Sequence, residues 1–107
     1  MYQMKLKVYD KLGNPFVFLE PKDIILEFPY MGHNSLRKFL SKNQVRIIDA
    51  QQGKFEVELS DFDLKGMNDG ENQSFVGTII QGSKQYVLQF ERALHVKNTD
   101  GVKSLKL

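Results

Sequence analysis

The chain contains no cysteine and no long apolar run. Without cysteine, disulfide bonds and thiolate chemistry are both excluded. The uninterrupted apolar stretches, Ile24-Ile25-Leu26 among them, are only a few residues long, whereas a membrane-spanning helix needs roughly 20 residues. The first residues also lack the basic start and apolar stretch of a secretory signal. We therefore expect synthesis in the cytoplasm and no membrane partner.

The chain also has little excess of one charge over the other. Fifteen lysines and arginines oppose thirteen acidic residues, which leaves a net charge of +2, and the lysines are scattered singly along the chain. Nucleic acids are bound through clustered basic residues, so we expect no nucleic-acid partner. With 41% hydrophobic and 26% charged residues among 107, the composition predicts one globular domain whose core is stable without a covalent cross-link.

The clearest pattern is a period-two alternation in the second half of the chain. Residues 45–47, 55–59 and 87–96 alternate apolar and polar side chains, and glycine-bearing turns separate these segments. Such alternation is typical of strands with one buried side and one solvent-facing side. We predict an antiparallel meander here, in which the apolar residues of 55–59 face the core.

The first half of the chain carries shorter apolar segments. Residues 4–8 alternate apolar side chains with lysines and predict a first strand, which ends at a turn over residues 10–15. Residues 16–19 are then expected to pair back on this strand. Residues 24–28 are rich in β-branched and aromatic side chains and predict a further strand.

Residues 30–44 allow two interpretations. Leu36, Phe39 and Leu40 lie at the i, i+3 and i+4 spacing of a short helix. A helix of this length is marginal without tertiary support. A mixture of strand and loop is therefore the alternative.

A polar corner at residues 60–66 follows the 45–59 hairpin. Phe62 and Leu64 are expected to be buried as plugs beneath the sheet, while the aspartates accept hydrogen bonds from backbone amides. Large aromatic side chains at core parity are expected to hold a cysteine-free core together. The aromatic residues expected in the core are Phe28, Phe55, Phe62, Phe75 and Phe90.

These segments together predict the fold class. About seven short strands bounded by turns are typical of an all-β, immunoglobulin-like antiparallel β-sandwich. We assign this sandwich to residues 1–97. Residues 98–107 begin with turn-forming residues and are expected to be a C-terminal tail or linker that only a neighbour orders.

No catalytic, cofactor or metal site is predicted. Residues 77–84 come close to a phosphate-binding loop, but the final serine and lysine stand in reversed order and strand formers fill the middle, so a hairpin turn is the better interpretation. The carboxylates at positions 61, 63, 69 and 71 do not follow the spacing of a calcium loop. They are interpreted as solvated turn residues.

Histidine and serine are equally uninformative about catalysis. His33 and His95 are the two histidines, and neither has a second histidine at ligand spacing. No Gly-x-Ser-x-Gly elbow is present to activate a serine. We therefore expect no cofactor and no enzymatic activity.

The hairpin sequence resembles a known family. The run Val45-x-Ile47-x-Asp49-x-x-x-Gly53-x-Phe55-x-Val57-x-Leu59 is similar to the N-terminal domain of phage baseplate upper proteins and related tail-fibre assembly domains. In that pattern a strand ending in aspartate is followed by a glycine turn, an alternating strand, a polar corner and two closing strands. Residues 45–96 fit this order, and residues 7–15 are similar to the family's opening strand and turn.

The resemblance implies a non-enzymatic structural part of a phage tail or baseplate. Such a part belongs to the virion and contacts other virion proteins and further copies of itself. Irregular segments and isolated apolar residues are expected to make these contacts. The expected interface residues are Tyr30, His33, Arg37, Lys38, Phe39, Val102, Leu105 and Leu107. The alternative is a ligand-binding sandwich domain that recognises a glycan or a receptor through an exposed aromatic residue.

Overall fold

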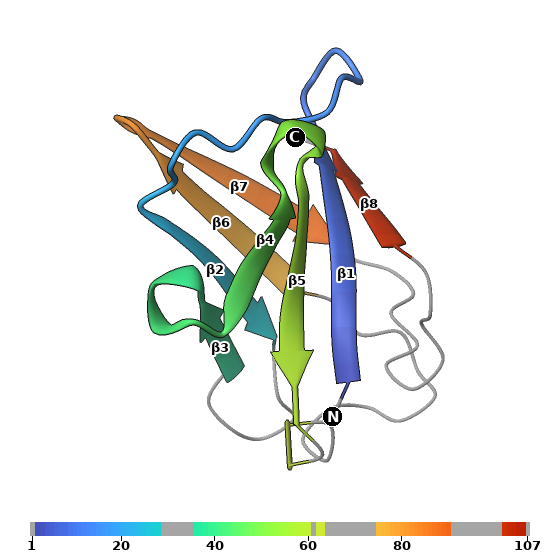
Figure 1. The fold of residues 1–107 in the computed structure, drawn as a ribbon, viewed down its shortest axis with the longest axis vertical. Helices are drawn as coiled ribbons and strands as arrows, with labels where there is room; N and C mark the ends of the chain where they lie inside the picture. The colour runs from blue at the N-terminus through green and yellow to red at the C-terminus, as the bar shows by residue number, and fades with distance from the viewer. Residues whose placement is uncertain (1, 29–35, 61, 64–74, 91–101, 107) are drawn as a thin grey trace.

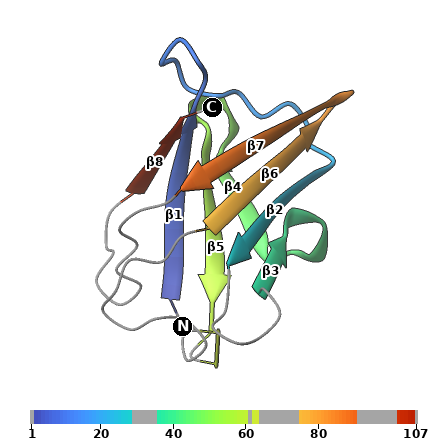
Figure 2. The ribbon, with the colours of Figure 1, turned by 180° about the vertical axis from the view of Figure 1, so that it is seen from behind.

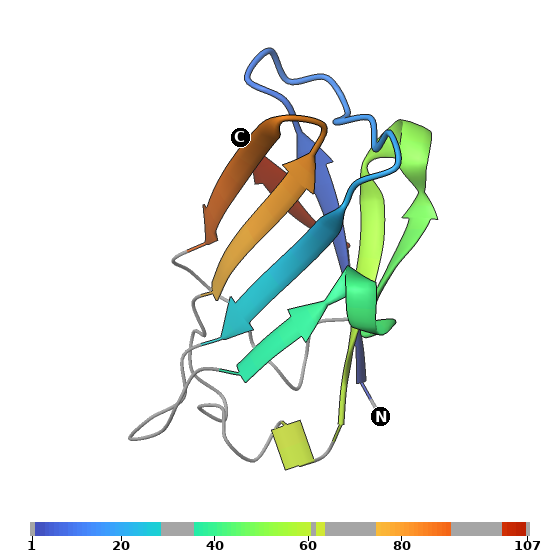
Figure 3. The same cartoon turned by 90° about the vertical axis from the view of Figure 1, so that its left-hand side faces the viewer.

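The protein is an all-β sandwich of two four-stranded sheets (Figures 1 and 3). A computed structural model describes residues 2–28, 36–60, 62–63, 75–90 and 102–106. Sheet A has the strand order β4-β5-β1-β8, and sheet B has the order β3-β2-β6-β7. The strands are β1 (Tyr2–Tyr9), β2 (Asp23–Phe28), β3 (Leu36–Phe39), β4 (Val45–Asp49), β5 (Lys54–Leu59), β6 (Phe75–Gln81), β7 (Lys84–Phe90) and β8 (Val102–Lys106). The predicted fold class is confirmed.

The core lies between the two sheets and follows the predicted alternation. Phe55, Val57 and Leu59 of β5 are fully buried, as the period-two pattern requires. The aromatic residues Phe28 and Phe55 are buried as expected. The remaining buried hydrophobic residues are Met4, Leu6, Val8, Phe16, Phe18, Ile24, Leu26, Val45, Ile79 and Leu88.

The turn between β4 and β5 depends on one aspartate and one glycine. The Asp49 carboxylate accepts hydrogen bonds from the backbone N–H groups of Gln51 (3.2 Å) and Gln52 (3.3 Å) and so caps the short 3-10 turn η2 (Ala50–Gln52). Gly53 has a φ of +68°, and a Cβ atom there would lie 2.6 Å from the Val8 carbonyl oxygen. The hairpin is therefore confirmed, and glycine is required at its turn.

The segment after β1 does not form the expected strand. Only an isolated bridge between Tyr9 and Pro15 joins it to β1. The backbone N–H of Phe16 donates to the Val8 carbonyl at 2.9 Å, whereas that of Phe18 donates to the Ala50 carbonyl, also at 2.9 Å. The expected pairing of residues 16–19 along β1 is therefore wrong, because this segment leaves β1 for the η2 turn after a single contact.

Two other local predictions resolve differently. Residues 36–39 form β3, which pairs with β2, and the 3-10 turn η1 (Leu40–Lys42) follows it. For residues 36–42 the strand and loop alternative is therefore correct, because β3 gains tertiary hydrogen bonds from β2, whereas a short helix is marginal without tertiary support. Phe62, expected as a buried plug, is 81% exposed. Asp63 takes the inward position at this corner instead, with an exposure of 7%.

Some predictions fall outside the described residues. These are the placement of Leu64, of the carboxylates at 61, 69 and 71, and of His33 and His95. The backbone of Phe75 and Phe90 is described within β6 and β7, but the burial of their side chains is not. The predicted hairpin of residues 77–84 is confirmed, because β6 and β7 pair from Phe75–Phe90 to Gln81–Lys84.

The C-terminal residues take a place in sheet A. Strand β8 pairs with β1 in parallel, with Lys5 opposite Val102 and Tyr9 opposite Lys106 (Figure 1). The expectation of a tail or linker outside the sandwich is wrong for residues 102–106, because β1 of the same chain orders them within sheet A. The apolar residues there are too sparse to indicate a strand on their own, and the hydrogen bonds that order them come from the first strand of the chain.

Candidate interaction surface

The outer side of sheet B carries a row of uncharged side chains that crosses all its strands. The register places Phe39 opposite Ile25, Ile25 opposite Thr78, and Thr78 opposite Val87. These side chains point outward, because their chain neighbours Ile24, Leu26, Ile79 and Leu88 are buried. We call the row, together with Val76 and Ile80 on β6, the apolar face.

The apolar face is open to solvent at its β6 and β7 side. Val76 is 37% exposed and Val87 is 54% exposed, whereas Ile25, Thr78 and Ile80 are half-buried. Val76 and Val87 are diagonal neighbours on β6 and β7, and exposed apolar side chains that lie together on a sheet are typical of contact surfaces. The face therefore offers a surface that a partner can desolvate at little cost.

Charged residues border this face, and they already have partners within the chain. Arg37 Nε lies 3.5 Å from Glu27 Oε2 in the adjacent cross-strand row. The Asp23 carboxylate accepts hydrogen bonds from the Ser41 N–H (3.0 Å) and hydroxyl (2.8 Å). These charged residues border the apolar face. Because they already have partners within the chain, they offer no obvious site for a bound ion.

The outer side of sheet A has the opposite character. Its central row runs Arg46–Glu56–Lys5 across β4, β5 and β1, and an ion pair joins Arg46 to Glu56. Other outward positions in this sheet include Lys7 opposite Lys54. Among the described side chains on this side, Ile48 is a large apolar exception, with an exposure of 47%. Glu56 is itself only 6% exposed, but the row is charged where that of sheet B is uncharged, so the two outer sides of the sandwich differ in kind.

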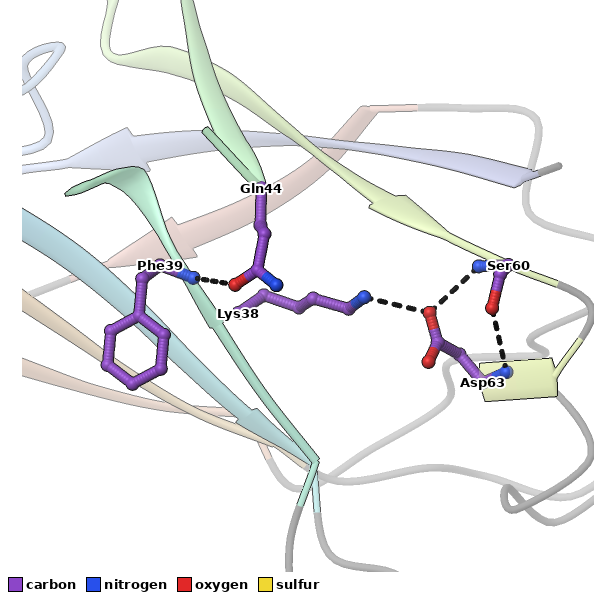
Figure 4. Close-up of polar contacts among 5 residues, drawn as sticks. All are labelled: Lys38, Phe39, Gln44, Ser60 and Asp63. Atoms are coloured by element: carbon purple, nitrogen blue, oxygen red, sulfur yellow. Dashed lines mark hydrogen bonds and ion pairs between the residues drawn. The ribbon is translucent and has the colours of Figure 1, made fainter. Parts of the chain in front are cut away.

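Lys38 does not belong to the apolar face. It points to the inner side of sheet B and reaches the corner after β5, where its Nζ lies 2.8 Å from Asp63 Oδ2 (Figure 4). The Ser60 N–H donates to Asp63 Oδ2 at 2.8 Å, and the Asp63 N–H donates to Ser60 Oγ at 3.0 Å. Lys38 therefore joins the two sheets at the sandwich border.

Electrostatics confirm the structural role of this pair. Burial alone would raise the pKa of Asp63, but hydrogen bonds from Lys38 and Ser60 and the charge of Lys38 outweigh burial and hold this pKa below its usual value. The side chains of Lys38 and Asp63 are only 13% and 10% exposed. A carboxylate held ionised by an adjacent ammonium has neither the raised pKa of a general acid nor access to a substrate.

The structure separates the predicted interface residues into several groups. Arg37 and Phe39 lie on the outer side of sheet B, and Lys38 lies on its inner side. Val102 and Leu105 lie within β8, where only the backbone is described. Tyr30, His33 and Leu107 fall outside the described residues.

Sequence reasoning missed the apolar face itself. Its signal is present in the sequence, because Ile24-Ile25-Leu26 and Thr78-Ile79-Ile80 place apolar or uncharged residues at both strand parities. A strand with one wet side would carry a polar residue at every second position. Apolar residues at both parities indicate a strand that buries apolar side chains on both of its sides.

A separate groove lies beside the hairpin of β6 and β7. It has a volume of about 580 Å³ and is lined by Asp10, Lys11, Leu12, Pro15, Phe16, Val17, Gln81 and Tyr86. The Gln81 side chain ties the 17–19 segment to β6 at one wall of the groove. Its Oε1 accepts a hydrogen bond from the Leu19 N–H (2.8 Å), and its Nε2 donates to the Val17 carbonyl (3.2 Å). Leu12 is 87% exposed at its rim.

The described ranges contain neither a metal-binding cluster nor a membrane-spanning helix. No three histidine, aspartate or glutamate side chains gather there as a metal site requires. No helix in that part of the chain is long and apolar enough to cross a membrane. Comparison with protein-family models, with curated proteins and with solved structures gives no match. The resemblance to phage baseplate domains therefore stays a prediction.

Proposed function

We propose that this protein is a non-enzymatic assembly module that binds other proteins through the apolar face of sheet B. The observation that carries the proposal is the uncharged row Phe39–Ile25–Thr78–Val87, set against the charged row on the opposite side of the sandwich. A side of a sheet that faces only water has no physical need for apolar residues across every strand.

The size of the face indicates the kind of contact. Four strands spaced about 4.8 Å apart and roughly 20 Å long give the whole outer side of sheet B an area of roughly 400 Å², of which the apolar face is the central part. Stable pairwise interfaces bury about 800 Å² on each partner. The face alone is therefore suited to a contact of modest strength, such as one of several that a subunit makes within a larger assembly.

The sequence resemblance suggests where such an assembly is found. It supports a proposal that the module is part of a phage tail or baseplate, that it resides in the virion, and that its partners are other virion proteins and copies of itself. This part of the proposal rests on the strand and turn pattern of residues 45–96.

The test compares one added charge on each side of the sandwich. Thr78→Lys places a charge at the centre of the apolar face, and Gln3→Lys places the same charge on the exposed outer side of sheet A. Both purified variants are titrated against recombinant proteins encoded beside this chain, with binding followed by interferometry. Loss of binding in Thr78→Lys alone supports the proposal. Equal effects of the two variants, or no binding by the wild-type chain, overturn it.

A second candidate function is ligand binding in the groove. Its support is the open volume beside Tyr86 and the exposed Leu12 at the rim, since aromatic and apolar walls with a few polar groups are typical of small-ligand sites. A glycan array probed with the wild-type chain and with Leu12→Asp tests this candidate. Binding to a glycan that Leu12→Asp abolishes would favour ligand recognition over assembly.

A further inference from the structure

Within the described residues, β7 is an edge strand that pairs only with β6 and lacks the usual protection, although β8 of sheet A lies near it. It lies at the border of sheet B (Figure 2) and pairs with β6 without interruption from Gln81–Lys84 to Phe75–Phe90. Proteins normally blunt such edges with bulges, prolines, charges or short strands. The seven residues of β7 contain no proline and a single charge, Lys84.

The other edge strands are better protected. Strand β4 has five residues and a register shift between Ile47 and Asp49, and β3 has four residues before the η1 turn. Strand β8 has five residues, of which two are lysines. The longest edge strand is thus also the most regular and the least charged, which is the pattern of a strand that pairs with another chain.

The pairing pattern shows which backbone groups of β7 are open. A two-residue turn at Gly82 and Ser83 closes the hairpin at the Gln81–Lys84 pair, and the closing pair of such a turn is hydrogen-bonded. Alternation then directs the N–H and C=O groups of Gln85, Val87 and Gln89 away from β6. Within the described residues, no backbone hydrogen bond from another element reaches these three residues.

The sequence of this open edge is self-complementary. Read from either end, residues 85–89 give glutamine, an apolar residue, valine, an apolar residue and glutamine. An antiparallel pair around a two-fold axis at Val87 therefore places Val87 opposite Val87 and Gln85 opposite Gln89. It places Lys84 opposite Phe90, so no two like charges meet. Most sequences lack this symmetry, which an isologous contact requires.

We propose that β7 pairs antiparallel with β7 of a second copy of this chain, around a two-fold axis at Val87. The three open residues of each copy then exchange roughly six backbone hydrogen bonds. Sheet B of one copy continues into sheet B of the other. The inference deepens the proposed assembly function and rests on it for the role of the joined sheet.

The apolar face supports the same register. Val87 ends the row Phe39–Ile25–Thr78–Val87 at the open edge. Pairing at Val87 continues this row directly into the row of the second copy. The joined outer side of the two sheets then measures roughly 800 Å², which is the area that one partner buries in a stable contact.

Opposite charges at position 87 test the register. Val87→Lys and Val87→Asp each place two like charges across the axis, where paired Cα atoms lie about 5.5 Å apart. Sedimentation velocity should show a dimer for the wild-type chain. The dissociation constant of the dimer should be at least about tenfold larger for each variant alone. An equimolar mixture of the two variants should restore the dimer, because lysine then faces aspartate.

Two further variants separate the edge from the face and from misfolding. Val76→Lys adds a charge to the apolar face on β6, away from the open edge, and should leave the dimer intact. Val87→Pro removes an N–H that points to solvent in the single copy, so it should abolish dimerisation while the circular dichroism spectrum stays that of a folded protein.

Three results would overturn the inference. A wild-type chain that stays monomeric would exclude β7 pairing. The proposed assembly function would still hold if the wild-type chain binds another protein and Thr78→Lys abolishes that binding. If Val87→Pro leaves the dimer unchanged, the two copies do not pair through β7 around Val87. If the mixture of Val87→Lys and Val87→Asp does not restore the dimer, the two-fold axis does not lie at Val87.

Discussion

Replacing Lys38 with methionine should destabilise the protein strongly, although Lys38 looks like an ordinary surface residue in the sequence. Methionine keeps most of the apolar stem but removes the ammonium that lies 2.8 Å from Asp63. The Asp63 carboxylate then remains in a position only 10% exposed, with Ser60 as a hydrogen-bond donor but without its adjacent cation.

The magnitude follows from burial. Removing one partner of a buried ion pair costs about 3–5 kcal/mol, and the small residual exposure of both groups favours the lower end, about 3 kcal/mol. For a domain of this size that loss corresponds to a decrease in Tm of about 15 °C. Arg37→Met is the matched control, because the adjacent pair with Glu27 is 60% and 37% exposed. It should cost less than about 1 kcal/mol.

The assay is urea denaturation of both variants and the wild-type chain between pH 7 and pH 3. Because the pKa of Asp63 is lowered in the folded state, its contribution to stability is complete above the unfolded pKa, near 4, and is lost as the pH falls through the folded pKa. Lys38→Met lacks this contribution, so the difference between wild type and variant should shrink toward pH 3.

A double mutant makes the test stricter. Asp63→Asn combined with Lys38→Met removes the stranded charge, so the pair of changes should cost clearly less than the sum of the single changes. A loss below about 1 kcal/mol for Lys38→Met, independent of pH, would refute the reasoning, because it would mean that solvent screens this pair like any surface pair.

Four other changes test the fold. Gly53→Ala should cost more than about 2 kcal/mol in thermal denaturation, because its Cβ would lie 2.6 Å from the Val8 carbonyl oxygen at a φ of +68°; a near-neutral result would mean that the turn readily shifts. Val57→Asp should abolish the cooperative unfolding transition, because it buries an unpaired carboxylate in the core; an unchanged Tm would reverse the assigned direction of β5. Phe62→Ser should change stability by less than about 0.5 kcal/mol, since that side chain is 81% exposed. Deleting residues 102–107 should lower Tm, because β1 loses the pairing with β8; an unchanged Tm would show that this strand adds nothing to the sheet.

Local sequence determined much of this protein. The alternation in residues 55–59 specifies which side of β5 is buried, because side chains alternate strictly along a strand. Asp49 and Gly53 specify the hairpin turn, since an aspartate can cap the turn and a glycine adopts a positive φ without strain. These features depend only on residues close together in the chain.

Features that join distant residues were decided by tertiary structure. Strand β8 is ordered by β1 at the other end of the chain, so its own sparse apolar residues do not reveal it. Lys38 and Arg37 are adjacent and chemically similar, yet one is tied to Asp63 between the sheets and the other is exposed. At the corner, Asp63 rather than Phe62 turns inward, because Lys38 arrives there from the other sheet.

The candidate site shows the same division. The sequence contains the self-complementary residues 85–89 and the apolar pairs of neighbours in β2 and β6, but not the order of the strands. Only the assembled sheet places β7 at a border and aligns Phe39, Ile25, Thr78 and Val87 in one row. Register across a sheet depends on backbone hydrogen bonds between segments far apart in the chain, and that is why the surface emerges from the fold rather than from any single segment.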